Sequence, residues 1–166
     1  IFGNFINRVV VLTNKYWEGV VPCYNQLHEY DKEIITQLNN TSVLMGEAIE
    51  NFKFREALKE LMNLARLGNK YLADTEPWKL QSTDKERVET IMNISIQIAG
   101  SLSILCKPFM PFTSIKLNAM LNLSKEKWKD AGMNVISNKH KINKAIHLFE
   151  KIEDDKIKEQ LSKLRE

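Results

Sequence analysis

The sequence has few of the residues that build disulfide-bonded, metal-binding or membrane-spanning proteins. Its 166 residues include two cysteines, Cys23 and Cys106, and three histidines, at spacings that fit neither a disulfide framework nor a zinc site. Free cysteines favour a reducing environment, and we therefore expect a cytoplasmic protein. No apolar run approaches the ~20 residues that cross a bilayer, so no membrane partner is expected. The apolar opening, residues 1–12, contains two asparagines and an arginine and lacks a small-residue cleavage site, which argues against a signal peptide.

Glycine and proline are also scarce, with 6 and 4 residues, so little interrupts long helices. Hydrophobic residues make up 43% and charged residues 27%, as in an ordinary globular protein, and the length suits a single domain over residues 1–166. The net charge of +3 permits an anionic partner without indicating one, since dedicated nucleic-acid modules are usually more basic. Because the chain begins without Met inside a helical pattern, we expect it to be part of a longer protein.

Apolar residues recur at steps of three and four along most of the chain, which predicts an all-α bundle of about five main helices. The first helix is expected at residues 2–17, with Asn4, Arg8 and Lys15 opposite its apolar face. The second is expected to begin at Asp31, as its N-cap.

A third helix, at about residues 54–73, has the clearest pattern. Its inward face is predicted to consist of Phe54, Ala57, Leu58, Leu61, Ala65, Gly68 and Leu72. A second face carries Lys59, Asn63, Arg66 and Lys70. The helix must end before Pro77, and Pro77 and the following LQSTDK, residues 80–85, are expected to form a loop.

The fourth helix is expected to open with a capping box of Thr83 and Glu86 and to run to about Cys106. Because its stretch IMNISIQIAGSLSIL is apolar nearly all round, we expect it to be the most buried helix. Shorter helices are predicted at residues 113–121 and 124–131, followed by an irregular segment and a solvated final helix. Four aromatic residues are assigned to packing: Trp17, Phe109, Phe112 and Trp128.

No constellation for catalysis is present in the sequence. A catalytic site needs a nucleophile with a base, paired carboxylates, a phosphate cradle or a metal cluster, and there is no glycine-rich phosphate loop. The histidines His28, His140 and His147 have no partner at a telling spacing, so we interpret them as surface residues. The acidic run at residues 153–155 could bind a cation weakly, but carboxylates are favoured at a helix N-terminus, and we expect the run to cap the final helix.

What remains is a surface with the side chains that bind unpaired bases. Asn4 and Arg8 lie one turn apart on one helical face, and Trp78 follows a helix-breaking proline. Single-stranded RNA is bound by such groups, since bases stack on aromatic rings and Arg or Asn side chains read their edges. Spacing alone leaves two interpretations of Trp78 open, either a plug in the core or a platform for a ligand.

Four stretches in order resemble the anticodon-binding domain of methionyl-tRNA synthetases. They are GNFINRVVVLTNKYWEGVVP, FREALKELMNLARLGNKYLADTEPWK, CKPFMPFTSIKL and LFEKIED, and the likeness covers essentially the whole chain. The N-x-x-x-R helix and the N-x-Y-x-x-x-x-x-P-W turn are specific in combination. The resemblance implies a helical bundle that follows a Rossmann-type catalytic domain and recognises the CAU anticodon of methionine tRNAs.

The resemblance also implies roles for single residues. An anticodon base would stack on Trp78, Pro77 would shape the turn, and Asn4 and Arg8 would contact anticodon bases. A further family asparagine would lie one turn before Asn4, at a position that precedes Ile1. Candidate phosphate contacts are Asn14, Lys15, Arg66 and Lys70.

The family's catalytic signatures are absent from the sequence. There is no HIGH-type signature, KMSKS-type loop or zinc-binding insertion, so ATP and zinc would belong to a catalytic domain upstream in the same chain. We therefore expect no cofactor and no catalysis in this chain alone, and two partners, the anticodon stem-loop of methionine tRNA and that catalytic domain. Two alternatives stay open: the anticodon domain of a related isoleucine or valine synthetase, and a helical protein-interaction domain without RNA binding.

Overall fold

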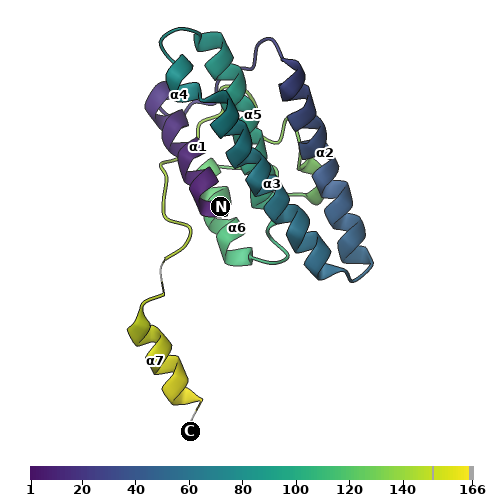
Figure 1. Ribbon diagram of the computed structural model, residues 1–166, viewed down its shortest axis with the longest axis vertical. Helices are drawn as coiled ribbons and strands as arrows, with labels where there is room; N and C mark the ends of the chain where they lie inside the picture. The colour runs from purple at the N-terminus through teal and green to yellow at the C-terminus, as the bar shows by residue number, and fades with distance from the viewer. Residues whose placement is uncertain (151, 165–166) are drawn as a thin grey trace.

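The computed structural model describes residues 1–150 and 152–164, and their regular structure is helical (Figure 1). The elements in chain order are α1 (Phe2–Trp17), α2 (Glu29–Glu50), α3 (Phe54–Thr75), α4 (Pro77–Leu80), α5 (Lys85–Leu105), α6 (Pro111–Leu121), the 3-10 turn η1 (Trp128–Asp130) and α7 (Asp154–Lys163). The bundle is built from α1, α2, α3, α5 and α6, which confirms the predicted all-α fold with about five main helices. The described residues contain no strand, and one isolated antiparallel bridge joins Val20 to Lys141.

Helix α5 lies at the centre of the bundle, where it contacts α1, α2, α3, α4 and α6. Every residue from Thr90 to Leu105 is buried, as predicted for a helix that is apolar nearly all round. By length and composition α5 could also cross a membrane, but 94% of its most apolar window is buried inside the protein. The prediction that no apolar stretch approaches membrane-spanning length is therefore wrong. The stretch that does so is α5, the central helix of the core. The cap of α5 also differs, because Asp84, not Thr83, accepts the bond from the N–H of Arg87 (3.0 Å).

Polar side chains on α5 hold the coil that follows η1. Gln97 donates from Nε2 to the carbonyl of Ile136 (2.7 Å), and its Oε1 accepts from the N–H of the same residue (3.0 Å). The Ser101 hydroxyl accepts from the N–H of Gly132 (2.8 Å). These groups are buried, so the bonds satisfy backbone that water cannot reach. The predicted irregular segment is thus ordered by the central helix.

Close packing joins α1 to α3. Phe5 is fully buried, and a Cβ at Gly68 would lie 2.4 Å from its Cζ, so only glycine allows the two helices this separation. Asn69, the next residue, donates from Nδ2 to the carbonyl of Ile1 (3.0 Å). The start of α1 is therefore held against the middle of α3.

Asp31 does not cap α2 in the way the sequence suggested. The N-cap is His28, whose N–H donates to Asp31 Oδ2 (2.8 Å). Asp31 is fully buried, where Arg87 donates two hydrogen bonds to it (2.5 and 2.9 Å) and the Tyr71 hydroxyl donates a third (2.6 Å). Burial alone would raise the pKa of Asp31, but these bonds to its charged form outweigh burial and hold the pKa below its usual range. The carboxylate thereby joins α2, α3 and α5.

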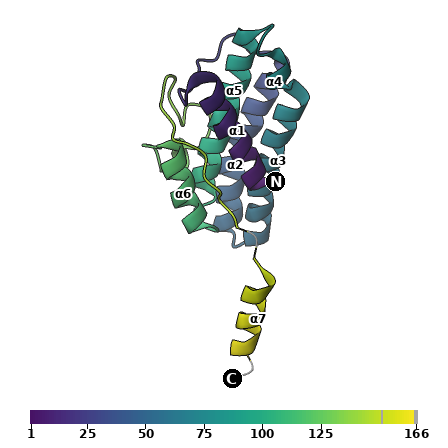
Figure 2. The same cartoon turned by 90° about the vertical axis from the view of Figure 1, so that its left-hand side faces the viewer.

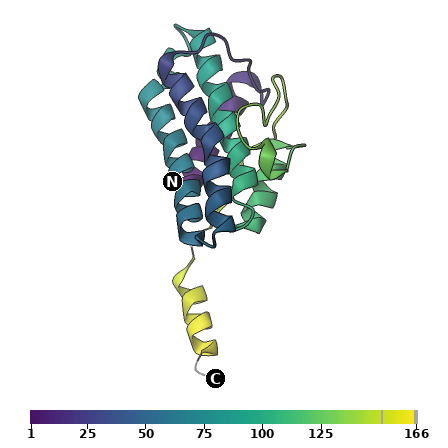
Figure 3. The same ribbon diagram turned by 90° about the vertical axis from the view of Figure 1, so that its right-hand side faces the viewer.

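Three residues that were predicted to pack in the core are instead exposed. Of the seven positions assigned to the inner face of α3, Phe54 (53% exposed) and Leu58 (40%) are wrong and the other five are buried. Both lie in the first turns of α3, at the end of the bundle formed by the α2–α3 hairpin, where a side chain has fewer neighbours (Figure 3). Phe112 was also wrongly assigned to packing, because it is 81% exposed. It lies two residues before Ser114, away from the buried face of α6.

The region after α6 departs most from prediction. The helix predicted at residues 124–131 is only the turn η1, in which Trp128 Nε1 donates to the carbonyl of Ser42 on α2 (3.0 Å). Trp17, Phe109 and Trp128 are partly buried against the core, which confirms their assignment to packing. The loop predicted at Pro77 and residues 80–85 is shorter than expected, because Pro77 opens α4, which runs to Leu80, and Lys85 already begins α5.

Helix α7 extends away from the bundle and has no buried residue (Figures 1 and 2). The acidic run lies at its N-terminus, with Glu153 as the N-cap and Asp154 and Asp155 in the first turn, as the capping interpretation predicts. Residue 151, in the predicted irregular segment, and residues 165–166, in the predicted final helix, lie outside the described residues.

Candidate nucleic-acid interface

The turn between α3 and α4 places Trp78 at the surface. Glu76 ends α3 in the left-handed region (φ 42°), which redirects the chain, and Pro77 then opens α4 at its first position, where a missing N–H costs nothing. Pro77 is buried, whereas Trp78 is 38% exposed. Of the two interpretations that spacing left open, the structure therefore excludes a tryptophan enclosed in the core.

Arg8 of α1 lies over the Trp78 ring, with its Cζ 5.0 Å from the ring centroid. Such a cation–π contact stabilises an exposed pair by about 0.5–1 kcal/mol and also fixes how the ring is oriented. Arg8 forms no hydrogen bond or ion pair with any residue that the structure describes, so its N–H donors stay available to a ligand. Two residues that are 70 positions apart in the sequence thus form one polar and aromatic surface.

Asn4 lies one turn before Arg8 on the same helix and is exposed. Its side chain makes no hydrogen bond to any described residue. Other asparagines nearby are used by the fold, since Asn69 donates to the carbonyls of Ile1 and Ala65. Asn4 therefore keeps a donor and an acceptor for another molecule.

Residues 21–165 match the family described as the anticodon binding domain of methionyl tRNA ligase. The chain belongs to this family. The methionine–tRNA ligases of Flavobacterium psychrophilum and of Bacteroides fragilis strain YCH46 are similar to it, at 54% identity over 167 residues and 50% over 165. Each alignment covers 99% of this chain and 24% of the ligase, so the chain spans about a quarter of the length of these curated relatives.

Solved structures share the fold of this anticodon-binding domain. The apo form of Mycobacterium tuberculosis methionyl-tRNA synthetase superimposes with a TM-score of 0.84 at 17% identity, covering 92% of this chain and 32% of that chain. The same enzyme bound by methionyl-adenylate gives a TM-score of 0.82 at 18% identity, covering 90% and 30%. At these identities the likeness concerns the fold alone.

Two of the four candidate phosphate contacts in this anticodon-binding domain lie on α1. Asn14 donates from Nδ2 to the carbonyls of Val10 (2.9 Å) and Asn143 (3.0 Å), which engages both of its N–H groups. A phosphate contact by Asn14 would therefore require one of these bonds to break. Lys15 is exposed, with Nζ 5.6 Å from the centroid of the Tyr16 ring, and keeps its donors.

The other two candidates lie on α3. Arg66 is exposed and donates from Nη1 to Asn63 Oδ1 (3.1 Å), which leaves most of its guanidinium open. Lys70 forms an ion pair with Asp74, which the Tyr30 hydroxyl also contacts (2.7 Å). The positive charge of Lys70 is thus partly neutralised by Asp74. Phosphate binding by Asn14, Lys15, Arg66 or Lys70 stays a prediction.

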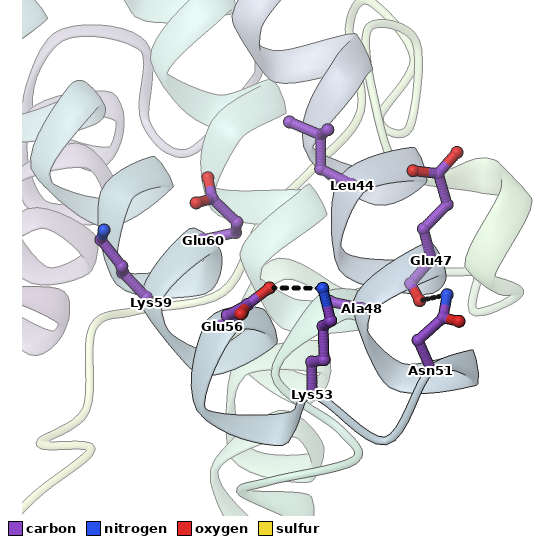
Figure 4. A pocket seen from close by; sticks show the side chains of 8 residues that line it. All are labelled: Leu44, Glu47, Ala48, Asn51, Lys53, Glu56, Lys59 and Glu60. Carbon is purple, nitrogen blue, oxygen red and sulfur yellow. Dashed lines mark hydrogen bonds and ion pairs between the residues drawn. The ribbon is translucent and has the colours of Figure 1, made fainter.

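Another pocket lies on other elements of the domain, between α2 and α3 (Figure 4). It has a volume of about 490 Å³, and the Lys53–Glu56 ion pair (3.6 Å) crosses it. The described residues that line it include no serine, threonine, cysteine or histidine, and no cluster of three metal-ligating side chains occurs among the described residues. This pocket offers no chemistry that the sequence overlooked.

A smaller pocket beside Asn4 contains polar residues that the sequence did not single out, Asn7 and His147. Asn7 was within reach of prediction, because it lies three residues after Asn4 and so on the same face of α1. His147 was not, because it comes from coil far away in the sequence, and no periodicity places coil against a helix.

Proposed function

We propose that this domain recognises the CAU anticodon of methionine tRNAs, as the C-terminal helical domain of a methionyl-tRNA synthetase. The observation that carries the proposal is the placement of Arg8 over the exposed ring of Trp78, with Asn4 one turn away. The family to which the chain belongs and the names of its relatives support the same function.

In the proposed mechanism Trp78 supplies a face on which an unstacked anticodon base lies. Stacking of one base on an aromatic side chain contributes ~1–3 kcal/mol to binding. Arg8 and Asn4 would read base edges, since the guanidinium offers several donors and the amide offers both a donor and an acceptor. Pro77 is buried and fixes the backbone beside the ring, so less conformational entropy is lost on binding.

The domain would act by positioning and not by chemistry. We propose that a catalytic domain in the same chain binds ATP and methionine, and that a zinc-binding insertion of that domain holds a zinc ion. We also propose that the protein acts in the cytoplasm. A correctly docked anticodon would place the distant acceptor end of the tRNA at that site. Each contact that forms only with the correct anticodon then favours charging of methionine tRNA over other tRNAs.

The test is a competition titration of the chain with two RNA hairpins at low salt, one with a CAU loop and one with a GAU loop. Wild type is compared with Arg8→Ala and Trp78→Ala. The matched controls are Arg55→Ala, which removes an exposed arginine from the start of α3, and Phe52→Ala, which removes an aromatic ring that is 81% exposed.

We expect wild type to prefer the CAU loop and both site variants to lose that preference, while the controls keep it. A preference for the GAU loop would instead support the isoleucine-type alternative. Equal binding of both loops by wild type would overturn the proposal and leave a basic surface without sequence preference.

A further inference from the structure

We propose that the pocket between α1 and the coil at residues 146–149 receives a second unpaired base of the same RNA, whose edge is read by Asn7 and His147. The inference rests on the proposed function and adds two residues and a second binding position to it. The pocket has a volume of about 290 Å³. Its walls are formed by Ile1, Gly3, Asn4, Asn7, Ile146, His147, Leu148 and Phe149.

The pocket is built by contacts that hold the coil along α1. At one end the carbonyl of Asn143 accepts a hydrogen bond from Asn14 Nδ2 (3.0 Å). At the other end the Phe149 ring packs edge-on against the Phe2 ring, with centroids 6.1 Å apart. Gly3 makes room for that ring, since a Cβ there would lie 3.0 Å from its Cδ2. The coil runs beside α1 in the views of Figures 1 and 2, and the contacts at its two ends hold it there.

The groups around the pocket suit a neutral, polar and flat ligand. Leu148 is buried and provides an apolar wall, together with the side chains of Ile1 and Ile146. Asn7 and His147 are exposed, and neither side chain makes a hydrogen bond to a described residue, so their donors and acceptors stay free. Among the described residues, no lysine, arginine or carboxylate lines the pocket, which disfavours a phosphate or a cation as the ligand.

The size of the pocket agrees with a single base. Pockets for small molecules usually measure about 300–1,000 Å³, so this one is at the lower limit and too small for a dinucleotide cofactor. A base combines apolar faces with an edge of donors and acceptors, which an amide can pair with in either sense. Phe149, which is 50% exposed at the rim, adds an aromatic surface beside that edge.

Helix α1 contributes residues both to the pocket and to the contact with Trp78. Arg8 directs its guanidinium to Trp78 on α4, while Asn4 and Asn7, within one turn of it, face the coil. Two neighbouring bases of an opened anticodon loop would then lie on either side of α1, one on Trp78 and one in the pocket. Recognition of unstacked bases that are spread apart is the usual way in which proteins read RNA sequence.

The experiment combines protein variants with hairpins that lack one base. The CAU hairpin and three derivatives, each with one abasic anticodon position, are titrated with wild type, Asn7→Ala, His147→Ala and Trp78→Ala. Asn40→Ala is the matched control, because Asn40 is an exposed asparagine on α2 without a hydrogen bond to described residues. Thermal unfolding of each variant checks that the fold is intact.

We expect Asn7→Ala and His147→Ala each to weaken binding of the intact hairpin by about 2- to 13-fold, the effect of one lost hydrogen bond. Both losses should disappear with the same abasic hairpin, and the loss from Trp78→Ala should disappear with a different one. Unchanged affinity in both pocket variants, or equal losses with every abasic hairpin, would overturn the inference. If wild type still prefers CAU over GAU and Trp78→Ala removes that preference, the proposed function stands without the pocket; if wild type shows no preference, both fail.

Discussion

The ring of Phe5 occupies the space that a side chain at residue 68 would need. A Cβ on Gly68 would lie 2.4 to 2.8 Å from three atoms of that ring, which is fully buried. Helix α1 can therefore approach α3 closely, and this separation determines where Arg8 lies relative to Trp78. The candidate interface thus depends on a packing contact that touches no ligand.

Substitution Gly68→Ala should destabilise the domain by about 1–3 kcal/mol, because the added methyl forces a rigid ring to move in a packed core. Urea unfolding of the chain measures this. Gly46→Ala in α2 is the control: its Cβ would meet the Trp128 ring at 3.4 Å, an ordinary contact, so the better helix propensity of alanine should leave stability unchanged or slightly higher. A Gly68→Ala protein as stable as wild type would show that α1 can shift freely.

The buried carboxylate of Asp31 should make stability depend on pH. Its folded pKa is lowered by hydrogen bonds from Arg87, Tyr71 and the N–H of His28, which outweigh burial. Its contribution is therefore complete above the unfolded pKa of about 3.9 and is lost as pH falls from about 5 toward the folded pKa. Unfolding in urea between pH 3 and pH 7 should show this loss.

Asp31→Asn should remove that part of the pH dependence and destabilise the protein by about 3–5 kcal/mol, since Arg87 would keep a buried charge without a partner. Glu29→Gln is the control, because Glu29 pairs with Lys32 at the surface and such pairs contribute little. Identical pH profiles for wild type and Asp31→Asn would contradict the assignment.

Gln97 should determine whether the coil after η1 stays on the bundle. Gln97→Leu leaves the N–H and the carbonyl of Ile136 buried without partners, at a cost of about 1–3 kcal/mol for each unsatisfied group. We expect faster hydrogen exchange at Ile136 and faster proteolysis of the coil, with little change in α2 or α3. Ser137→Ala, an exposed neighbour, is the control. Uniform loss of protection across the helices would point to global unfolding instead.

In the intact ligase, Trp78→Ala should lower kcat/KM for tRNA charging by roughly 5- to 150-fold, which corresponds to the ~1–3 kcal/mol of one stacked base. Activation of methionine by ATP in the absence of tRNA should keep the wild-type rate. Phe52→Ala should change neither reaction. Equal losses in charging and in activation would mean that the substitution disturbs the fold rather than a tRNA contact.

Salt should separate phosphate contacts from base contacts. Lys15→Ala and Arg66→Ala should each reduce the slope of log K against log salt by roughly 0.7–1, because one fewer counterion is released on binding. Lys70→Ala should have a smaller effect, since Asp74 already neutralises this lysine. The slopes are obtained from hairpin affinities measured between about 50 and 200 mM salt, a range over which phosphate contacts weaken strongly. An unchanged slope for both Lys15→Ala and Arg66→Ala would remove them from the interface.

Local pattern was enough for most of the fold and for the individual site candidates. The step of three and four residues identified α1, α3 and the buried α5, because burial of one helix face requires that periodicity. It failed for Phe54 and Leu58, since periodicity continues to the end of a helix where neighbouring elements do not. It also failed for residues 124–131, where contacts to α2 and α5 replace helix formation.

By itself, then, the amino-acid sequence determined the main helices, most of their inward faces, and the presence of Asn4, Arg8 and the Pro77-Trp78 turn, since each follows from residues that are close together in the chain. Only the tertiary structure decided that Arg8 lies over Trp78, that Asp31 is a buried ion-pair partner and not the N-cap residue of α2, and that His147 borders a pocket with Asn7. These relationships join residues that are distant in sequence, and they are set by how closely α1, α3 and α5 pack, which no local pattern encodes.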